Sequence, residues 1–270
     1  MKKFYKMHGL GNDFVIFDLR EIKVEFNTEN IKKICNRKLG IGCDQLIIIE
    51  KDPQADCFMR IFNKDGSEVE SCGNATRCVA RLLQEENKQS SYKINTIGGL
   101  LKAEKISQTD YAVNIGKAKT GYNEIPISKK IETSKIDFND ELLGKAFAVN
   151  VGNPHIVFIV RALDQINLKK HVAKYENNIL FPERVNVNVI EIINKHEINL
   201  KVWERGAGET MACGTGACAS FFAAYQQKLV NNNVKIKQPG GSLNITINSS
   251  KEIIMTGPTH LSFIGETQLI

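Results

Sequence analysis

Two cysteines, Cys72 and Cys213, each begin a Cys-Gly segment that reads as the start of a helix. A helix N-terminus presents unpaired backbone N–H groups and a partial positive charge, which bind carboxylates and lower the pKa of a cysteine thiol. Gly73 and Gly214, the residues that follow, allow a ligand to approach the backbone closely. Two such thiols could take a proton from one face of a carbon and deliver a proton to the opposite face.

The two cysteine segments belong to an internal repeat with an offset of 141 residues, because 72 + 141 = 213. By the same offset Asn12 corresponds to Asn153, Gln45 to Asn186, and Asn63 to Glu204. Polar residues therefore stand at equivalent positions in both halves of the chain. The repeat predicts two related lobes that bring their thiols and anion-binding helix starts to one cleft.

Each half reads as β-β-α-β-β-α-β-β-β, with its cysteine at the start of the longer apolar helix. The shorter helices are expected over Thr28–Lys38, stopped by Gly40, and over roughly Asp164–Asn177. The helix after Cys213 is almost entirely small or apolar, so we expect the curved sheet of its own lobe to surround it. The expected N-terminal lobe comprises residues 1–116 and 258–270, and the C-terminal lobe residues 117–257.

Composition limits the class of protein. With 42% hydrophobic and 24% charged residues, the chain is typical of a soluble globular protein. The net charge of +6 comes from scattered lysines rather than a basic stripe with interleaved aromatic residues, which argues against a nucleic-acid partner. No apolar run approaches the ~20 residues of a membrane-spanning helix. We therefore expect neither a membrane nor a nucleic acid as partner.

The seven cysteines are an odd number and include no Cys-x-x-Cys pair. This argues against a disulfide framework and against a zinc ribbon. The first residues, Met-Lys-Lys-Phe-Tyr-Lys, turn polar before an apolar signal segment could form. The expected location is the reducing cytoplasm, and no metal site is expected.

The chemistry that two opposed thiols favour is proton removal from the α-carbon of an amino acid. That proton is very weakly acidic, and many enzymes use pyridoxal phosphate as an electron sink for its removal. No pyridoxal-binding pattern is visible, so we expect no cofactor. Stabilisation must then come from oriented dipoles in a dry site.

The two cysteine segments are accompanied by three further motifs: Met7-His-Gly-Leu-Gly-Asn-Asp-Phe14, Gly152-Asn-Pro-His155 and Pro182-Glu-Arg-Val-Asn186. Together they resemble diaminopimelate epimerases in motif order from the first residues to at least Ser220. The resemblance implies interconversion of LL- and meso-2,6-diaminopimelate in lysine and peptidoglycan precursor synthesis. It also implies an α+β fold of two pseudo-symmetric lobes, each a mixed or antiparallel β-barrel-like sheet around a central helix, and a homodimer.

The resemblance also implies roles for individual residues. Cys72 and Cys213 match the acid/base pair, with His155 and Glu204 as auxiliary groups beside them. The residues that match substrate contacts are Asn12, Gln45, Asn63, Gly73, Asn74, Asn153, Asn186, Glu204, Arg205, Gly214 and Thr215. Among these, Arg205 is expected to bind the distal carboxylate in a bidentate pair, and Glu204 is placed to hold an ammonium group.

Three other functions would share parts of this residue pattern. A racemase or epimerase of proline or hydroxyproline would share the two-thiol chemistry, but diaminopimelate carries a second ammonium and carboxylate that Arg205 and several amides could recognise. A redox protein could use Cys72 and Cys213 as a switching disulfide, although the surrounding amides and charges would then have no purpose. A non-catalytic amino-acid-binding protein would not need both thiols.

Overall fold

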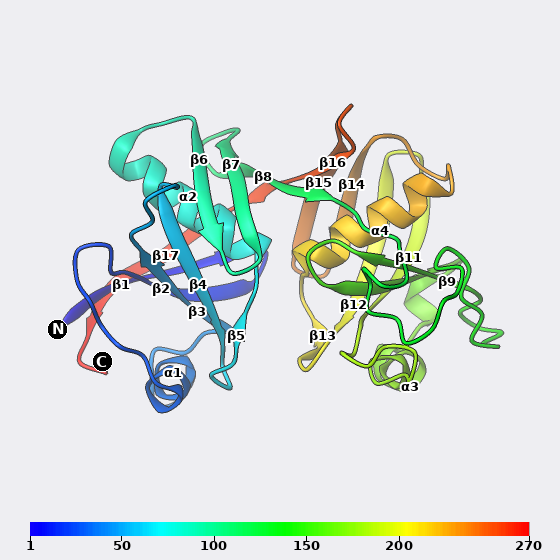
Figure 1. The fold of residues 1–270 in the computed structure, drawn as a ribbon, viewed down its shortest axis with the longest axis horizontal. Helices are drawn as coiled ribbons and strands as arrows, with labels where there is room; N and C mark the ends of the chain where they lie inside the picture. The colour runs from blue at the N-terminus through cyan, green and yellow to red at the C-terminus, as the bar shows by residue number, and fades with distance from the viewer. Residues whose placement is uncertain (270) are drawn as a thin grey trace. The chain divides into compact units, whose positions relative to one another are not determined.

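The computed structural model describes residues 1–269 and divides the chain into two compact units (Figure 1). Unit 1 comprises Met1–Asn114 and the segment from Thr256 onward, and unit 2 comprises Ile115–Met255. These divisions fall two residues before the sequence-based lobe boundaries at 116 and 257. Residue 270, the last residue of the range 258–270 assigned to the first lobe, lies outside the described residues.

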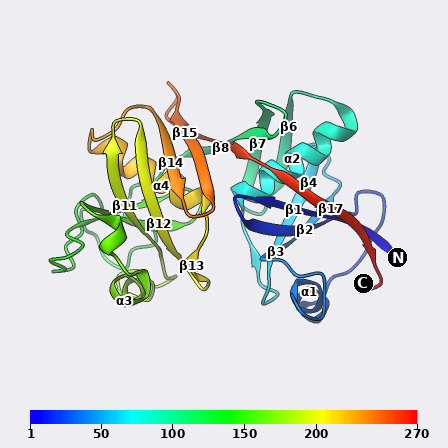
Figure 2. The same ribbon diagram turned by 180° about the vertical axis from the view of Figure 1, so that it is seen from behind.

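Unit 1 is a mixed sheet with two helices. Its elements are β1 (Lys2–Gly9), β2 (Asn12–Asp18), α1 (Thr28–Cys35), β3 (Gln45–Glu50), β4 (Cys57–Asn63), β5 (Glu68–Val69), α2 (Gly73–Asn87), β6 (Ser91–Thr96), β7 (Gly99–Lys105), β8 (Asp110–Lys117) and β17 (His260–Thr267). Strand β2 pairs in parallel with β3, β3 and β4 are antiparallel, and β4 then pairs in parallel with β6. Strand β1 lies between β2 and β17, antiparallel to both (Figure 2).

Unit 2 repeats this order of pairings. Its elements are β9 (Ala146–Asn150), β10 (Pro154–Val160), η1 (Leu163–Gln165), α3 (Leu168–His171), η2 (Ala173–Tyr175), β11 (Asn186–Asn194), β12 (Glu197–Glu204), β13 (Gly208–Thr210), α4 (Gly214–Gln226), β14 (Asn233–Gln238), β15 (Gly241–Ile247) and β16 (Glu252–Pro258). The chain passes from one unit to the other within β8 and within β16. Strands β10 and β11 are parallel, β11 and β12 antiparallel, and β12 and β14 parallel. This correspondence makes unit 2 a structural repeat of unit 1.

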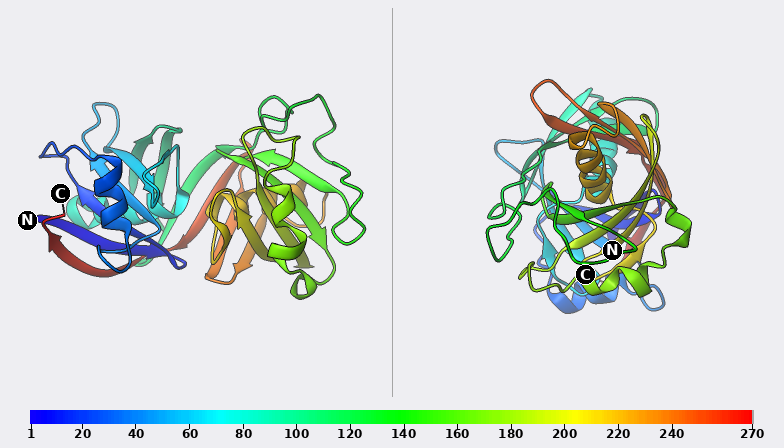
Figure 3. Two further views of the ribbon diagram at one scale, coloured as in Figure 1. Left: turned by 90° about the horizontal axis from the view of Figure 1, so that it is seen from below. Right: turned by 90° about the vertical axis from the view of Figure 1, so that its right-hand side faces the viewer.

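A central helix lies inside the sheet of each unit. Helix α4 contacts strands β9, β10, β11, β12, β14 and β15, which lie around it in Figures 1 and 3. Its residues from Gly216 to Ala224 are all buried, as expected for a helix with no polar face. Helix α2 contacts β1, β6 and β7, and its last two turns are partly exposed. The expected α+β fold, with a barrel-like sheet around one helix in each unit, is therefore confirmed.

The strands beside each central helix are buried on both faces. In β3 the run Leu46–Ile49 is continuously apolar and buried, as parallel strands covered on both sides require. Alternate residues Leu46 and Ile48 pack in one cluster with Ile31 and Ile34 of α1. Because side chains alternate along a strand, the intervening residues of β3 face the interior that holds α2.

The second predicted helix, Asp164–Asn177, was wrong as a continuous element. The structure has two short 3-10 turns and the four-residue helix α3 in its place. The break occurs because Ile166 and Asn167 have extended backbone, and the Asn167 side chain caps the new helix by accepting from the Lys170 N–H. The first predicted helix, Thr28–Lys38, ends earlier than expected, at Cys35.

Three strands were not predicted. Strands β5 and β13 are only two and three residues long and follow tight turns, so they have no visible periodicity. Strand β17 was missed because Phe263 and Ile264 are adjacent and both half-exposed, which removes the alternation expected of a strand.

Candidate functional site

Cys72 is the N-cap residue of α2 and has an extended backbone, and the Thr76 N–H donates to its carbonyl. Its side chain is partly exposed, and Sγ lies 3.9 Å from Asn12 Oδ1. The Asn74 side-chain amide donates to the same oxygen at 3.2 Å. The structure thus brings together three of the residues predicted for the site in unit 1.

Gln45 and Asn63 lie opposite one another at the start of β3 and the end of β4. The Gln45 amide donates to Asn63 Oδ1 at 3.0 Å, and Asn63 Nδ2 donates to Ser67 at 3.1 Å. Gln45 Oε1 is buried with no hydrogen-bond partner, so it is an acceptor that a bound ammonium or hydroxyl group could satisfy.

Cys213 is the N-cap residue of α4 and caps this helix with its own sulfur. The Gly216 N–H donates to Sγ at 3.3 Å, and Thr215 Oγ1 lies 3.5 Å from Sγ. The backbone N–H of Cys213 donates to Gln238 Oε1 at 2.8 Å. The sulfur is therefore held directly at the helix N-terminus, as the sequence predicts.

The protonation state of Cys213 differs from the expectation. Burial raises the pKa of the Cys213 thiol well above its ordinary value, and the nearby Glu204 carboxylate raises it further. The Gly216 N–H and the Thr215 hydroxyl lower it, but these effects are smaller. The lowered pKa expected from the helix N-terminus alone is therefore wrong for Cys213, because burial and Glu204 outweigh the helix N–H groups and raise the pKa of its thiol.

Glu204, Arg205 and Asn186 form a second polar group in unit 2. Glu204, at the end of β12, accepts a hydrogen bond from Thr210. Asn186 is buried, donates to the Pro154 carbonyl at 3.0 Å, and accepts the Arg205 N–H at 2.9 Å. The Arg205 side chain is exposed, and its Nη1 donates to the Glu183 carbonyl at 2.8 Å. Asn186 thus fixes the backbone from which Arg205 extends.

His155 on β10 is fully buried, and both of its ring nitrogens are engaged. Asn188 Nδ2, on the neighbouring strand β11, donates to Nδ1 at 3.0 Å. Nε2 then carries the proton and donates to Asn153 Oδ1 at 2.8 Å. Burial lowers the pKa of His155 to about 3, so it is neutral and orients two asparagines rather than exchanging protons.

Asn188 was missed in the sequence analysis. Adding 141 to Phe14 and Ile47 gives His155 and Asn188, so unit 2 has a hydrogen-bonded polar pair where unit 1 has an apolar pair. Asn188 also lies beneath the start of α4, because a Cβ on Gly216 would be 2.6 Å from its Oδ1. A polar residue that replaces an apolar one across the repeat was the signal that could have identified it.

The buried neutral His155 predicts a pH-dependent stability. Its folded pKa of about 3 lies below the ordinary value of 6.5, so the unfolded chain binds a proton first as the pH falls. The stabilisation is complete above pH 6.5 and is lost progressively between pH 6.5 and about 3, by up to a few kcal/mol.

Urea unfolding at pH 7.5 and pH 5 measures this dependence. We expect His155→Gln to lose less stability than the wild type on acidification, whereas His196→Gln, which changes an exposed histidine, should behave as the wild type does. An equal loss in His155→Gln would contradict the assignment.

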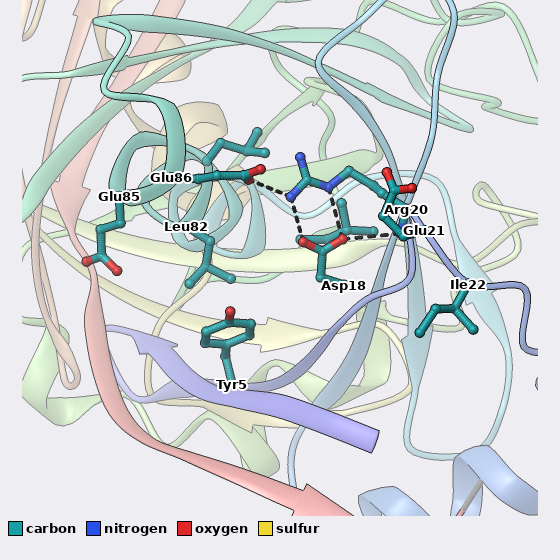
Figure 4. Close-up of a pocket in the computed structure, with 10 residues that line it drawn as sticks. Tyr5, Asp18, Arg20, Glu21, Ile22, Leu82, Glu85 and Glu86 are labelled. Atoms are coloured by element: carbon teal, nitrogen blue, oxygen red, sulfur yellow. Dashed lines mark hydrogen bonds and ion pairs between the residues drawn. The ribbon is translucent and has the colours of Figure 1, made fainter. Parts of the chain in front are cut away.

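A cavity of about 460 Å³ lies elsewhere in unit 1 (Figure 4). Tyr5, Asp18 and Glu86 line it, and Arg20 binds both carboxylates. None of the predicted site residues lines this cavity, and its cation is already paired. We therefore do not assign the functional site to it.

Metal-binding clusters and membrane-crossing helices are both absent from residues 1–269. No three His, Cys, Asp or Glu side chains in this range are grouped so that they could hold a metal ion. Across the same range no helix combines the length and apolar character that a membrane crossing needs.

The arrangement of the fold is found in solved structures of racemases and epimerases. A predicted epimerase from Pseudomonas aeruginosa superposes with a TM-score of 0.72 at 14% identity, covering 99% of both chains. A probable proline racemase from Agrobacterium radiobacter gives 0.69 at 13% identity, covering 100% of this chain and 94% of that one. This chain therefore shares the fold of a class of solved racemases and epimerases.

Sequence similarity defines the family within this class. The family model for diaminopimelate epimerase matches residues 4–121 and 147–262. A diaminopimelate epimerase from Zymomonas mobilis is 44% identical over 97% of this chain and 96% of its own length. The chain belongs to the diaminopimelate epimerase family.

Proposed function

We propose that this protein interconverts LL- and meso-2,6-diaminopimelate without a cofactor, with Cys72 and Cys213 as the acid/base pair. The observation that carries the proposal is the position of both cysteines as N-cap residues of the central helices in two repeated units. Family membership supports the substrate, which is the precursor of lysine and of peptidoglycan.

The helix N-termini would bind the reacting carboxylate through the backbone N–H groups of Gly73, Asn74, Gly214 and Thr215. Carboxylate binding there places the partial positive charge where negative charge develops as the α-proton leaves. One cysteine, as thiolate, removes that proton, and the other, as thiol, protonates the opposite face of the carbon.

Burial and the Glu204 carboxylate raise the pKa of the Cys213 thiol, which suits the acid role. When Cys213 acts as the base, its thiolate must be stabilised by substrate. An ammonium group bound at Glu204 would neutralise the carboxylate that raises the pKa of Cys213, because the repulsion between the two anions is then removed. Substrate binding and thiolate formation would therefore be coupled in unit 2.

The distal end of diaminopimelate carries a second carboxylate and ammonium. Arg205 has an exposed side chain on a backbone fixed by Asn186, and we assign it to this carboxylate. This recognition separates the proposal from a racemase of proline or hydroxyproline, whose substrates lack the second charged end.

Incubation with LL-diaminopimelate in deuterated water tests the function. We expect deuterium to enter only the α-position and the meso isomer to form, with no added pyridoxal phosphate and with a chelator present. If the protein exchanged or isomerised proline or hydroxyproline but not diaminopimelate, its function would instead be that of the related racemases. An enzyme that needs added metal or pyridoxal phosphate would contradict the cofactor-free mechanism.

We also propose that the protein is a cytoplasmic homodimer. Within residues 1–269 none of the seven cysteines is in a disulfide, which suits a reducing compartment. On β17, Phe263 and Ile264 are each 50% exposed on opposite faces of the strand. Exposed apolar side chains on a strand favour a second copy of the chain as partner.

Substitution on β17 tests the dimer. Phe263→Asp is expected to give monomers in light scattering, because it places a charge in the apolar contact. The control Leu100→Asp changes a residue of equal exposure, 50%, on β7 and should remain dimeric. A monomeric wild type would refute the homodimer, and a dimeric Phe263→Asp variant would move the interface elsewhere.

A further inference from the structure

Arg77 on α2 is fully buried, five residues after Cys72. Burial of a guanidinium is costly unless it is paired and hydrogen-bonded. Its Nη2 donates to Asn74 Oδ1 at 2.9 Å and passes close to Gly9, where a Cβ would lie 3.0 Å from Nη2. The offset of 141 places Cys218 at the equivalent position of α4, so the repeated fold does not itself require an arginine here.

The guanidinium determines how the Asn74 amide is oriented. Arginine has only donors, so Asn74 must turn its oxygen toward Arg77 and its Nδ2 away. Nδ2 then donates to Asn12 Oδ1 at 3.2 Å. Because the Asn74 NH₂ group can only donate, Asn12 must turn its Oδ1 toward Asn74 and its Nδ2 away. The orientation of Asn74 therefore fixes that of Asn12.

The far end of this chain of hydrogen bonds is Asp44. Asn12 Nδ2 lies 3.4 Å from Asp44 Oδ2, and an ionised carboxylate only accepts. Asp44 is held in turn by Arg37, at 2.8 Å, and by the Asp13 N–H, at 3.2 Å. A group with donors only and a group with acceptors only therefore stand at the two ends of the Asn74–Asn12 pair.

We propose that Arg77 and Asp44 are positioning residues that fix the amide orientations of Asn74 and Asn12 beside Cys72. The fixed orientation leaves Asn12 Oδ1 facing the Cys72 sulfur, where it can accept a hydrogen bond from the thiol or from a substrate ammonium. This inference deepens the proposed function and relies on it for the identity of the substrate.

Kinetics of Arg77 variants test the inference. In Arg77→Met the amides can turn over, so KM for diaminopimelate should rise about fivefold to tenfold, the value of one or two lost hydrogen bonds. Arg77→Lys keeps a donor-only group and should recover much of this loss. The control Arg81→Met removes an arginine one turn later on α2, which binds Glu85 and the Thr259 carbonyl, and should leave KM unchanged. Partial misfolding lowers kcat and not KM, so an unchanged KM in Arg77→Met overturns the proposal.

If Arg77→Met fails to fold, Asp44→Asn tests the same proposal from the other end of the Asn74–Asn12 pair. Asp44 is 43% exposed at its side chain, so this change tests orientation at little cost to folding. We expect KM to rise, because an amide at position 44 no longer fixes Asn12. Asp52→Asn is the matched control, since Asp52 accepts from Asn95 at 2.9 Å in the same way but outside the site. Equal KM values for the two variants refute the role of Asp44.

Alkylation by iodoacetamide separates this proposal from the function itself. The rate at Cys72, followed by peptide mass spectrometry, requires no substrate. It should change at least about threefold in Arg77→Met and stay unchanged in Arg81→Met, because only the first alters the polar groups around the sulfur. If the wild type does not epimerise diaminopimelate, but the alkylation rate at Cys72 still differs between the wild type and Arg77→Met, only the proposed function is refuted. An unchanged rate at Cys72 refutes the positioning role.

Discussion

Replacing either Cys72 or Cys213 by alanine is expected to lower diaminopimelate epimerisation by roughly 10²–10⁴-fold, the usual contribution of a general acid–base group. Inversion needs a proton acceptor on one face and a donor on the other, so neither cysteine can replace its counterpart. Steady-state turnover of LL- to meso-diaminopimelate measures the effect. Serine variants at either position are expected to retain slow α-proton exchange from the face served by the remaining thiol.

Cys78→Ala is the control for this prediction. Cys78 lies on the same helix as Cys72, is fully buried, and burial raises the pKa of its thiol to about 12. It therefore has no accessible thiolate, and its loss should leave turnover near the wild-type value. Near-normal epimerisation by either Cys72→Ala or Cys213→Ala would show that the two-base assignment is wrong.

Arg205→Ala is expected to raise KM for diaminopimelate by roughly 10–100-fold, the value of a charge-assisted hydrogen-bonded pair. Arg205→Lys should also raise KM strongly, because lysine keeps the charge but lacks the planar fork that binds a carboxylate at two points. Initial-rate kinetics at varied substrate concentration separate KM from kcat.

The same substitution at a neighbouring arginine serves as the comparison. Arg184 is exposed and pairs with Glu176 at 3.3 Å, so Arg184→Lys should leave KM unchanged. If Arg205→Ala binds diaminopimelate with unaltered affinity, another residue must recognise the distal carboxylate.

The internal offset of 141 was the most informative feature of the sequence. It relates Gln45 to Asn186 and Asn63 to Glu204, and these residues lie at the starts of β3 and β11 and the ends of β4 and β12. Such equivalence is visible in sequence because turns and strand ends need particular residue types at fixed spacing. The apolar character of α4 similarly predicted a helix enclosed by its own sheet.

Local patterns were less reliable where the chain departs from regular structure. The helix expected over Asp164–Asn177 is interrupted because Asn167 caps a new helix there, a local hydrogen bond that hydrophobic spacing does not register. Strand β17 was not predicted because both of its faces are partly exposed, so its sequence lacks the alternation of apolar and polar residues.

By itself the sequence determined the repeated architecture, the two helix-start cysteines and the family, because these depend on residue type and spacing along the chain. The tertiary structure alone decided the electrostatic state of the site. Burial and the nearby Glu204 raise the pKa of the Cys213 thiol, burial lowers the pKa of His155, and Arg77 donates to Asn74 from within the same buried region. These properties depend on desolvation and on partners brought together across strands and helices, and spacing along the chain does not encode either.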